Sequence, residues 1–166
     1  GVAVLLWLDA VLGSLGLLGS QVVAWGILGA GILLLGVAIR TSTSRMAIGA
    51  GEGWLPPLCW TAAPALAVLV VAACSAPGWL WQTEFGGYDA LSYHLQLPKE
   101  WFVQGRITPS PWNVYSSLPS LMEGAFLHLM VLDGGPLPTA ITAQLLHAAM
   151  GVLTAATTDR KSTRLN

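Results

Sequence analysis

An uncharged run of apolar residues at positions 22–39 constrains this chain more than any other feature of its sequence. A run of this kind suits a transmembrane helix, which needs about 20 mostly apolar residues. Only 9% of the residues are charged, whereas a soluble domain usually carries about 25%. So few charges cannot cover a water-facing surface, and lipid is the solvent that tolerates this balance. The sequence therefore predicts an integral membrane protein.

Other apolar runs resemble this one, so we expect an all-α, polytopic transmembrane helix bundle of about five spans. The expected spans are 2–18, 22–39, 58–81, 118–132 and 137–157. The longest polar segment, 82–117, separates the third span from the fourth. We expect it to be a long extracytoplasmic loop containing short juxtamembrane helices. Two arginines in the 40–57 loop slightly favour the cytoplasm for that loop, which would place 82–117 on the opposite side.

The last eight residues, 159–166, have a different character from the rest of the chain. They resemble the translation of a sequencing-library adapter, and they hold Asp159, Arg160, Lys161 and Arg164. We therefore interpret 1–158 as a partial transmembrane domain and 159–166 as an adapter-derived tail. On this interpretation the natural reading frame continues beyond Thr158.

The composition also excludes some partners. The formal net charge is -1, so no basic patch points to nucleic acid. We interpret Cys59 and Cys74, which lie in or beside one apolar run, as small apolar residues. No cluster of His, Cys, Asp and Glu has metal-ligand spacing, so we assign no metal ligand. The sequence specifies no cofactor and leaves the use of a divalent metal open.

The loop at 82–117 contains signals for two short helices. Asp89 stands where it could cap a helix that begins at Ala90. Leu91 and Leu95, four residues apart, would give that helix an apolar stripe. Pro98 suits the first position of a second helix.

The second helix has its own end signal and candidate anchors. Gly105 could end it, and Trp101 with Phe102 could anchor it in the interface. The sequence thus predicts two short amphipathic helices that lie on the bilayer.

A longer string in this loop resembles a known family. The string comprises residues 87–95 (GYDALSYHL), 97–99 (LPK), 105–106 (GR) and 113–116 (NVYS), followed by Pro119 and Glu123. It resembles the first luminal loop of GT-C superfamily glycosyltransferases. It is most similar to bacterial membrane proteins grouped with the protein mannosyltransferase and aminoarabinose transferase families. The resemblance covers about residues 78–130. Ala90 stands where many relatives have an acidic residue, and two spans precede the matching one.

The resemblance implies a membrane glycosyltransferase that uses a polyprenyl-phosphate-linked sugar donor. It implies transfer to an acceptor, which the sequence does not identify, at the extracytoplasmic face of a bacterial plasma membrane. It assigns the catalytic role to Asp89. Such a carboxylate could take or orient the proton of the acceptor, and the leaving phosphate would need positive charge or N–H donors.

Further residues of this segment are candidates for binding the donor phosphate or the substrate: His94, Lys99, Arg106, Tyr93 and Glu123. In an ideal α-helix Tyr93 falls near the face of Asp89, whereas His94 lies about 140° away. We therefore predict no pairing of Asp89 with His94. Each of these residues also has a structural interpretation, as a helix cap, an interfacial aromatic or a solvated charge.

Two other classes of function stay open. The chain could belong to a transporter or channel, with Asp9, Glu123 and His128 marking a polar pathway, or to a non-enzymatic membrane scaffold. In either case Asp9 and Glu123 should face the protein interior or a cavity, because an ionisable group in lipid is costly. We interpret His128 and His147 as isolated packing residues.

Overall fold

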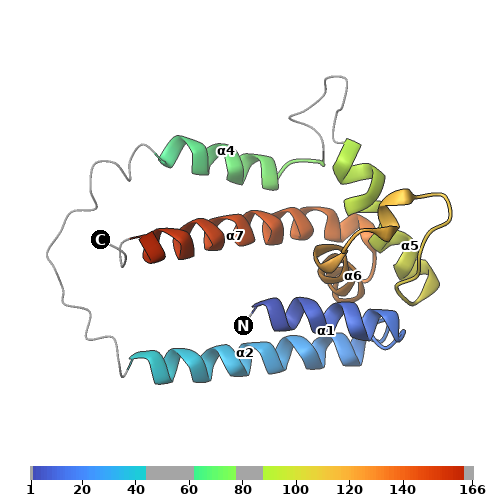
Figure 1. Ribbon diagram of the computed structural model, residues 1–166, viewed down its shortest axis with the longest axis horizontal. Helices are drawn as coiled ribbons and strands as arrows, with labels where there is room; N and C mark the ends of the chain where they lie inside the picture. Colours follow the sequence, from blue (N-terminus) through green and yellow to red (C-terminus); the bar gives the residue numbers. More distant parts are fainter. Residues whose placement is uncertain (1, 44–61, 78–87, 163–166) are drawn as a thin grey trace, which may run out of the picture.

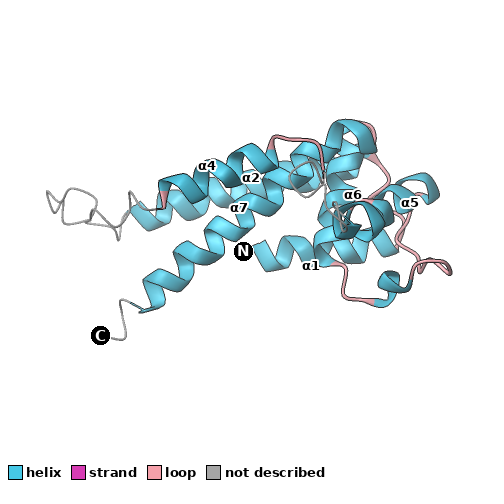
Figure 2. Ribbon diagram, turned by 90° about the horizontal axis from the view of Figure 1, so that it is seen from above, coloured by secondary structure: helices cyan, strands magenta, loops and turns pink. Residues whose placement is uncertain are grey.

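The computed structural model describes residues 2–43, 62–77 and 88–162. Within these ranges the chain is helical and contains no strand, which confirms the all-α class (Figure 2). The elements are α1 (Val2–Ser14), α2 (Gln21–Thr43), α4 (Ala63–Ala73), η2 (Ala90–His94), α5 (Gln96–Gln104), η3 (Val114–Ser117), α6 (Leu121–Asp133) and α7 (Pro136–Ser162).

The helices form an elongated bundle with a compact end. α2, α4 and α7 run along the long axis, and α5 lies with α6 at one end of the molecule (Figure 1). α6 is central, because it packs against α1, α2, α5 and α7, while α4 packs along α7. Most of α6 is buried as a result, including Glu123 and His128.

Two helices are long and apolar enough to cross a membrane. They cover Gln21–Thr41 and Pro136–Ala155, and only 6% and 11% of their most apolar windows are buried inside the protein. The other predicted spans correspond to shorter helices in the described ranges, namely α1, α4 and α6. The five-span arrangement therefore stays a prediction.

α4 has a proline close to its start. Pro64 lies in the first turn of the helix. A proline there disrupts no hydrogen bond, since the first N–H groups of a helix have no partner within it. The rest of the predicted third span (58–61 and 78–81), Cys59 and the loop at 44–57 lie outside the described residues. Cys74 is a free, exposed cysteine.

α1 and α6 pack closely against each other. A Cβ atom on Gly124 would lie 3.5 Å from the backbone nitrogen of Ala10, so the two backbones approach closely. By contrast, a Cβ on Gly26, Gly29 or Gly36 would meet nothing within 4 Å. These three glycines of α2 therefore make no close helix contact with the described part of the chain.

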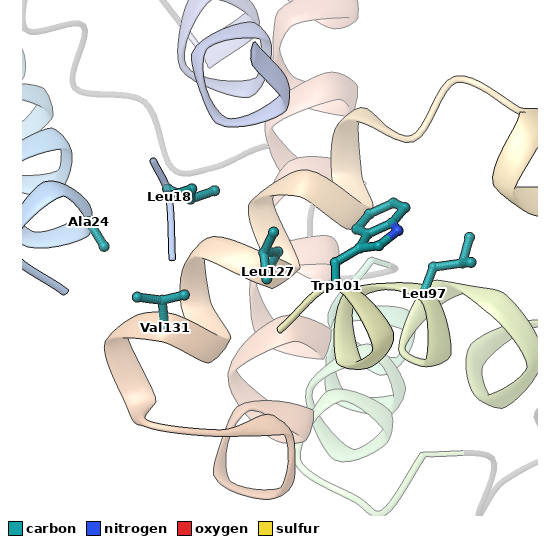
Figure 3. Close-up of a cluster of buried hydrophobic side chains, with 6 residues drawn as sticks. All are labelled: Leu18, Ala24, Leu97, Trp101, Leu127 and Val131. Carbon is teal, nitrogen blue, oxygen red and sulfur yellow. The ribbon is translucent and has the colours of Figure 1, made fainter. Parts of the chain in front are cut away.

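A buried apolar cluster lies where α5, α6 and the start of α2 meet. Figure 3 shows its side chains, which are Leu18, Ala24, Leu97, Trp101, Leu127 and Val131. Trp101 is only 1% exposed, and its indole Nε1 donates a hydrogen bond of 2.8 Å to the carbonyl of Thr108. The predicted interfacial anchor is thus a core residue, because the chain after α5 turns back and supplies an acceptor for the indole.

The two predicted loop helices exist, with shifted boundaries. α5 begins at Gln96, so Pro98 is its third residue rather than its first. Gly105 ends it as predicted, in a left-handed conformation with φ 73° that glycine adopts without steric cost.

Candidate functional site

A cavity of about 670 Å³ opens between α4, α6, α7 and the segment that begins at Tyr88. Its lining residues are Leu69, Ala72, Ala73, Tyr88, Asp89, Ala90, His94, Leu95, Phe126, Ala143, Gln144, His147 and Ala148. A volume of this size suits a small-molecule site with mostly apolar walls and a few polar groups. Two of the predicted site residues, Asp89 and His94, therefore share one cavity.

Asp89 does not cap the following helix as expected. Asp89 has helical torsion angles (φ -62°, ψ -44°), and its side chain makes no capping hydrogen bond. Ala90–His94 then form a π-helix, in which the Leu95 N–H donates to the carbonyl of Ala90 at 2.9 Å. Single π-turns of this kind are rare and frequently lie at functional sites.

The π-turn explains why Asp89 and His94 line the same cavity. The 140° separation assumed an α-helix with 3.6 residues per turn. A π-turn closes its hydrogen bond one residue later, so residues five apart approach the same face. The two residues thus line one cavity, although His94 bonds to Glu123 and the structure shows no hydrogen bond between His94 and Asp89 among the described residues.

His94 is held by Glu123 of α6. Their Nδ1 and Oε1 atoms lie 2.5 Å apart. The side chain of Glu123 is 8% exposed, and that of His94 is 33% exposed. The expectation that Glu123 faces the protein interior is confirmed, and its partner is a ring that reaches the cavity.

Tyr93 stacks beside this pair. Its ring centroid lies 4.1 Å from that of His94 and 4.4 Å from that of Tyr115.

Burial raises the pKa of Tyr93, and the negative charges of Asp89 and Glu123 raise it further. The pKa of Tyr115 is also raised, mainly by the interaction with Tyr88 and a hydrogen bond to it. Both phenols therefore stay protonated at neutral pH.

Asn113 fixes the return leg of the loop against the π-turn. Its Nδ2 donates to the carbonyl of Ser92 at 2.8 Å, and its Oδ1 accepts from the N–H of Tyr115 at 3.2 Å. One side chain thus connects η2 to the start of η3, which positions the ring of Tyr115.

The sequence analysis missed His147. It was interpreted as a packing residue, yet it lines the cavity, and its ring centroid is 6.4 Å from that of His94. Gln144, one turn earlier on α7, also lines the cavity and donates to the carbonyl of Ser75 at 2.9 Å. Two polar residues three apart in an apolar helix share a face, and this spacing was the available signal.

Lys99 and Arg106 are exposed and do not line this cavity. Lys99 lines a smaller hollow of about 330 Å³ beside Glu100 and Trp112. Their predicted role toward a donor phosphate stays a prediction. No group of three or more His, Cys, Asp and Glu in the described part of the chain could hold a metal ion.

A second polar pair lies away from the cavity. His128 bonds through Nδ1 to Asp9 Oδ1 at 2.8 Å and through Nε2 to the carbonyl of Ala24 at 3.0 Å. Asp9 and His128 are 5% and 8% exposed. The burial of Asp9 confirms the expectation that it faces the protein interior. His128 is buried too, but it is not isolated as was predicted, because it bonds to Asp9.

The cavity thus offers a carboxylate, an imidazole bonded to a second carboxylate, and another imidazole, between apolar walls. Such groups can orient a hydroxyl and take its proton. No protein-family model, curated protein or solved structure matches this chain.

Proposed function

We propose that this chain is part of a GT-C type membrane glycosyltransferase, which moves a sugar from a polyprenyl-phosphate-linked donor to an acceptor at the extracytoplasmic face. The observation that carries the proposal is the position of Asp89. Asp89 lines a cavity between helices, directly before a π-turn, and its side chain makes no capping bond. A carboxylate serving only as a cap would instead bond to the helix N-terminus.

The exposed apolar surfaces support a place in the membrane. α2 and α7 present most of their apolar residues outward, and a soluble monomer rarely exposes contiguous apolar surface on this scale. α1, α4 and α6 would be parts of further spans in a multi-pass bacterial plasma-membrane protein. The 82–117 segment would then be extracytoplasmic, with the cavity facing that side.

The chemistry follows from the groups around the cavity. An acceptor oxygen attacks the anomeric carbon while the lipid phosphate leaves. Asp89 would accept a hydrogen bond from the acceptor hydroxyl and hold it in line for attack. The apolar walls from α4 and α7, including Leu69 and Ala148, suit the isoprenoid chain of the donor. Lys99 and Arg106 remain the predicted cationic contacts for the phosphate.

The test is sugar transfer by the gene product that contains these residues, purified in lipid nanodiscs and supplied with polyprenyl-phosphate sugars. Asp89→Asn should lower kcat by roughly 100-fold or more, as expected for loss of a catalytic carboxylate. Asp133→Asn is the matched control, since Asp133 is exposed and does not line the cavity. Equal rates for Asp89→Asn and the parent would refute the proposal.

A further inference from the structure

We infer that His94 and Glu123 act as a dyad in which His94 Nε2 takes the proton of the acceptor hydroxyl. This inference rests on the proposed glycosyl transfer and deepens it by naming the proton acceptor. It changes the role of His94 from binding the donor phosphate to acting as a base. It makes Glu123 a positioning residue that acts through His94.

The first step of the argument is the burial of Glu123. Its side chain is 8% exposed, and Oε1 lies 2.5 Å from His94 Nδ1. Glu123 also stands in the first turn of α6, where the helix dipole stabilises a negative carboxylate. A buried carboxylate is retained only with such partners, so the pair is held together in the folded protein.

The second step is the tautomer of His94. An ionised carboxylate only accepts hydrogen bonds, so Nδ1 carries the proton that it donates to Glu123. The lone pair of a neutral imidazole then lies on Nε2. His94 lines the cavity and is one-third exposed, which leaves Nε2 as the nitrogen available to a substrate. Tyr93 packs 4.1 Å from the imidazole, centroid to centroid, and restricts its rotation.

The third step is to assign separate roles to Asp89 and His94. Asp89 is exposed at the cavity, so it can bind hydroxyl groups of the sugar or the acceptor. As a chemical class, an imidazole nitrogen holds a proton more strongly than a carboxylate oxygen does, which makes it the better general base of the two. The cavity therefore supplies one group to orient the hydroxyl and another to accept its proton.

The transfer step balances without a further reactant. The acceptor O–H bond breaks, and its proton goes to His94 Nε2. The acceptor oxygen bonds to the anomeric carbon, and the bond from that carbon to the phosphate oxygen breaks, with its electron pair leaving on the lipid phosphate. The imidazolium, paired with Glu123 at 2.5 Å, then returns its proton to the phosphate or to water.

The experiment measures transfer by the same nanodisc preparation, with His94→Ala and Glu123→Gln. His94→Ala should lower kcat roughly 10²- to 10⁴-fold with little change in KM, and added imidazole should restore part of the rate. Glu123→Gln should also lower kcat, since an amide can hold the ring in the wrong tautomer. Glu100→Gln is the matched control, because Glu100 bonds to Gln96 away from the cavity.

The outcomes separate the two proposals. A parent protein that transfers no sugar overturns the proposed function itself. If the parent is active and Asp89→Asn is impaired, then a His94→Ala protein with the parent kcat, or one that imidazole does not rescue, overturns the dyad alone. Nitrogen NMR of the three histidines gives a readout independent of turnover, because an Nε2–H tautomer at His94 would also overturn it.

Discussion

The carboxylate of Asp9 and the imidazole of His128 lie 2.8 Å apart, although 119 positions separate them in the sequence. The other ring nitrogen of His128 faces the carbonyl of Ala24, which only accepts, so Nε2 carries a proton. The pair thus exists as an aspartate with an imidazolium or as an aspartic acid with a neutral ring. It connects α1, α2 and α6 at one point in both forms.

Removing one member of the Asp9–His128 pair should destabilise the protein strongly. Asp9→Leu or His128→Leu leaves the other member of the pair buried without its ionisable partner, at a cost of about 3–5 kcal/mol. The double variant leaves no ionisable group of the pair behind. Its loss of unfolding free energy should be much smaller than the sum of the losses in the two single variants. Thermal unfolding in detergent measures this, with Asp133→Asn as the exposed control. Strictly additive losses would show that the two side chains are not coupled.

Gly13 should resist replacement by alanine. A Cβ there would lie 2.5 Å from Ile107 Cδ1 and 2.9 Å from its Cγ1, while Ile107 N–H donates to the Gly13 carbonyl at 2.9 Å. Gly13→Ala should therefore lower the unfolding free energy by about 1–3 kcal/mol. Adding Ile107→Val removes the nearest methyl group and should recover part of that loss.

The matched control for this position is Gly29→Ala in α2. A Cβ at Gly29 meets no atom within 4 Å, so the substitution should stabilise its helix by about 0.5–1 kcal/mol. Denaturation midpoints compare the variants. If Gly29→Ala lowered the unfolding free energy as much as Gly13→Ala, the steric explanation would be contradicted.

Asn113 should govern the local stability of the π-turn. Asn113→Ala removes both of its hydrogen bonds, to Ser92 and Tyr115, at about 1 kcal/mol each. Asn113→Asp keeps an acceptor for Tyr115 but sets a carboxylate oxygen against the carbonyl of Ser92, and since both only accept, it should also open the turn. Hydrogen exchange of amides 90–95 measures the opening of the turn. Exchange unchanged in both variants, as expected for the exposed control Ser117→Ala, would rule out this role.

Tyr93 and Tyr115 should titrate above their ordinary pKa of 10.0. All three tyrosines of the chain lie in this segment, so tyrosinate absorbance reports on it directly. The raised pKa values stabilise the fold fully below pH 10, and this contribution is lost as the pH rises through the folded values. Asp89→Asn should shift the titration curve to lower pH, because its negative charge raises the pKa of both Tyr93 and Tyr115. A curve that coincides with that of Asp133→Asn would refute the electrostatic contribution of Asp89.

The sequence predicted features that depend on local chemistry. The helical class follows from the long apolar runs. The end of α5 at Gly105 follows from the need for a left-handed residue there. The burial of Asp9 and Glu123 follows from the cost of placing charge in lipid. The pairing of side chains distant in sequence could not be predicted. For example, 29 positions separate His94 from Glu123, and periodicity does not identify such partners. Trp101 was misplaced for the same reason, because only the folded return loop brings Thr108 to its indole.

The cavity was predicted only in part. Asp89 and His94 were candidates, but their relation depended on the kind of turn between them. An α-turn is the common form of a helical turn and a π-turn is rare, so the hydrogen bond from Leu95 to Ala90 was not predicted. His147 was missed because a single histidine in an apolar helix is most often a packing residue.

The π-turn at Ala90–His94 also makes the site depend on the number of residues in the segment. Loss of one residue there would let the chain close as an ordinary α-helix and would rotate the preceding residues by about 100°. Asp89 would keep its carboxylate and its neighbours in sequence, yet it would point away from the cavity. The alignment of the site is thus encoded by chain length as well as by side chains, so a one-residue deletion would be more damaging there than most substitutions.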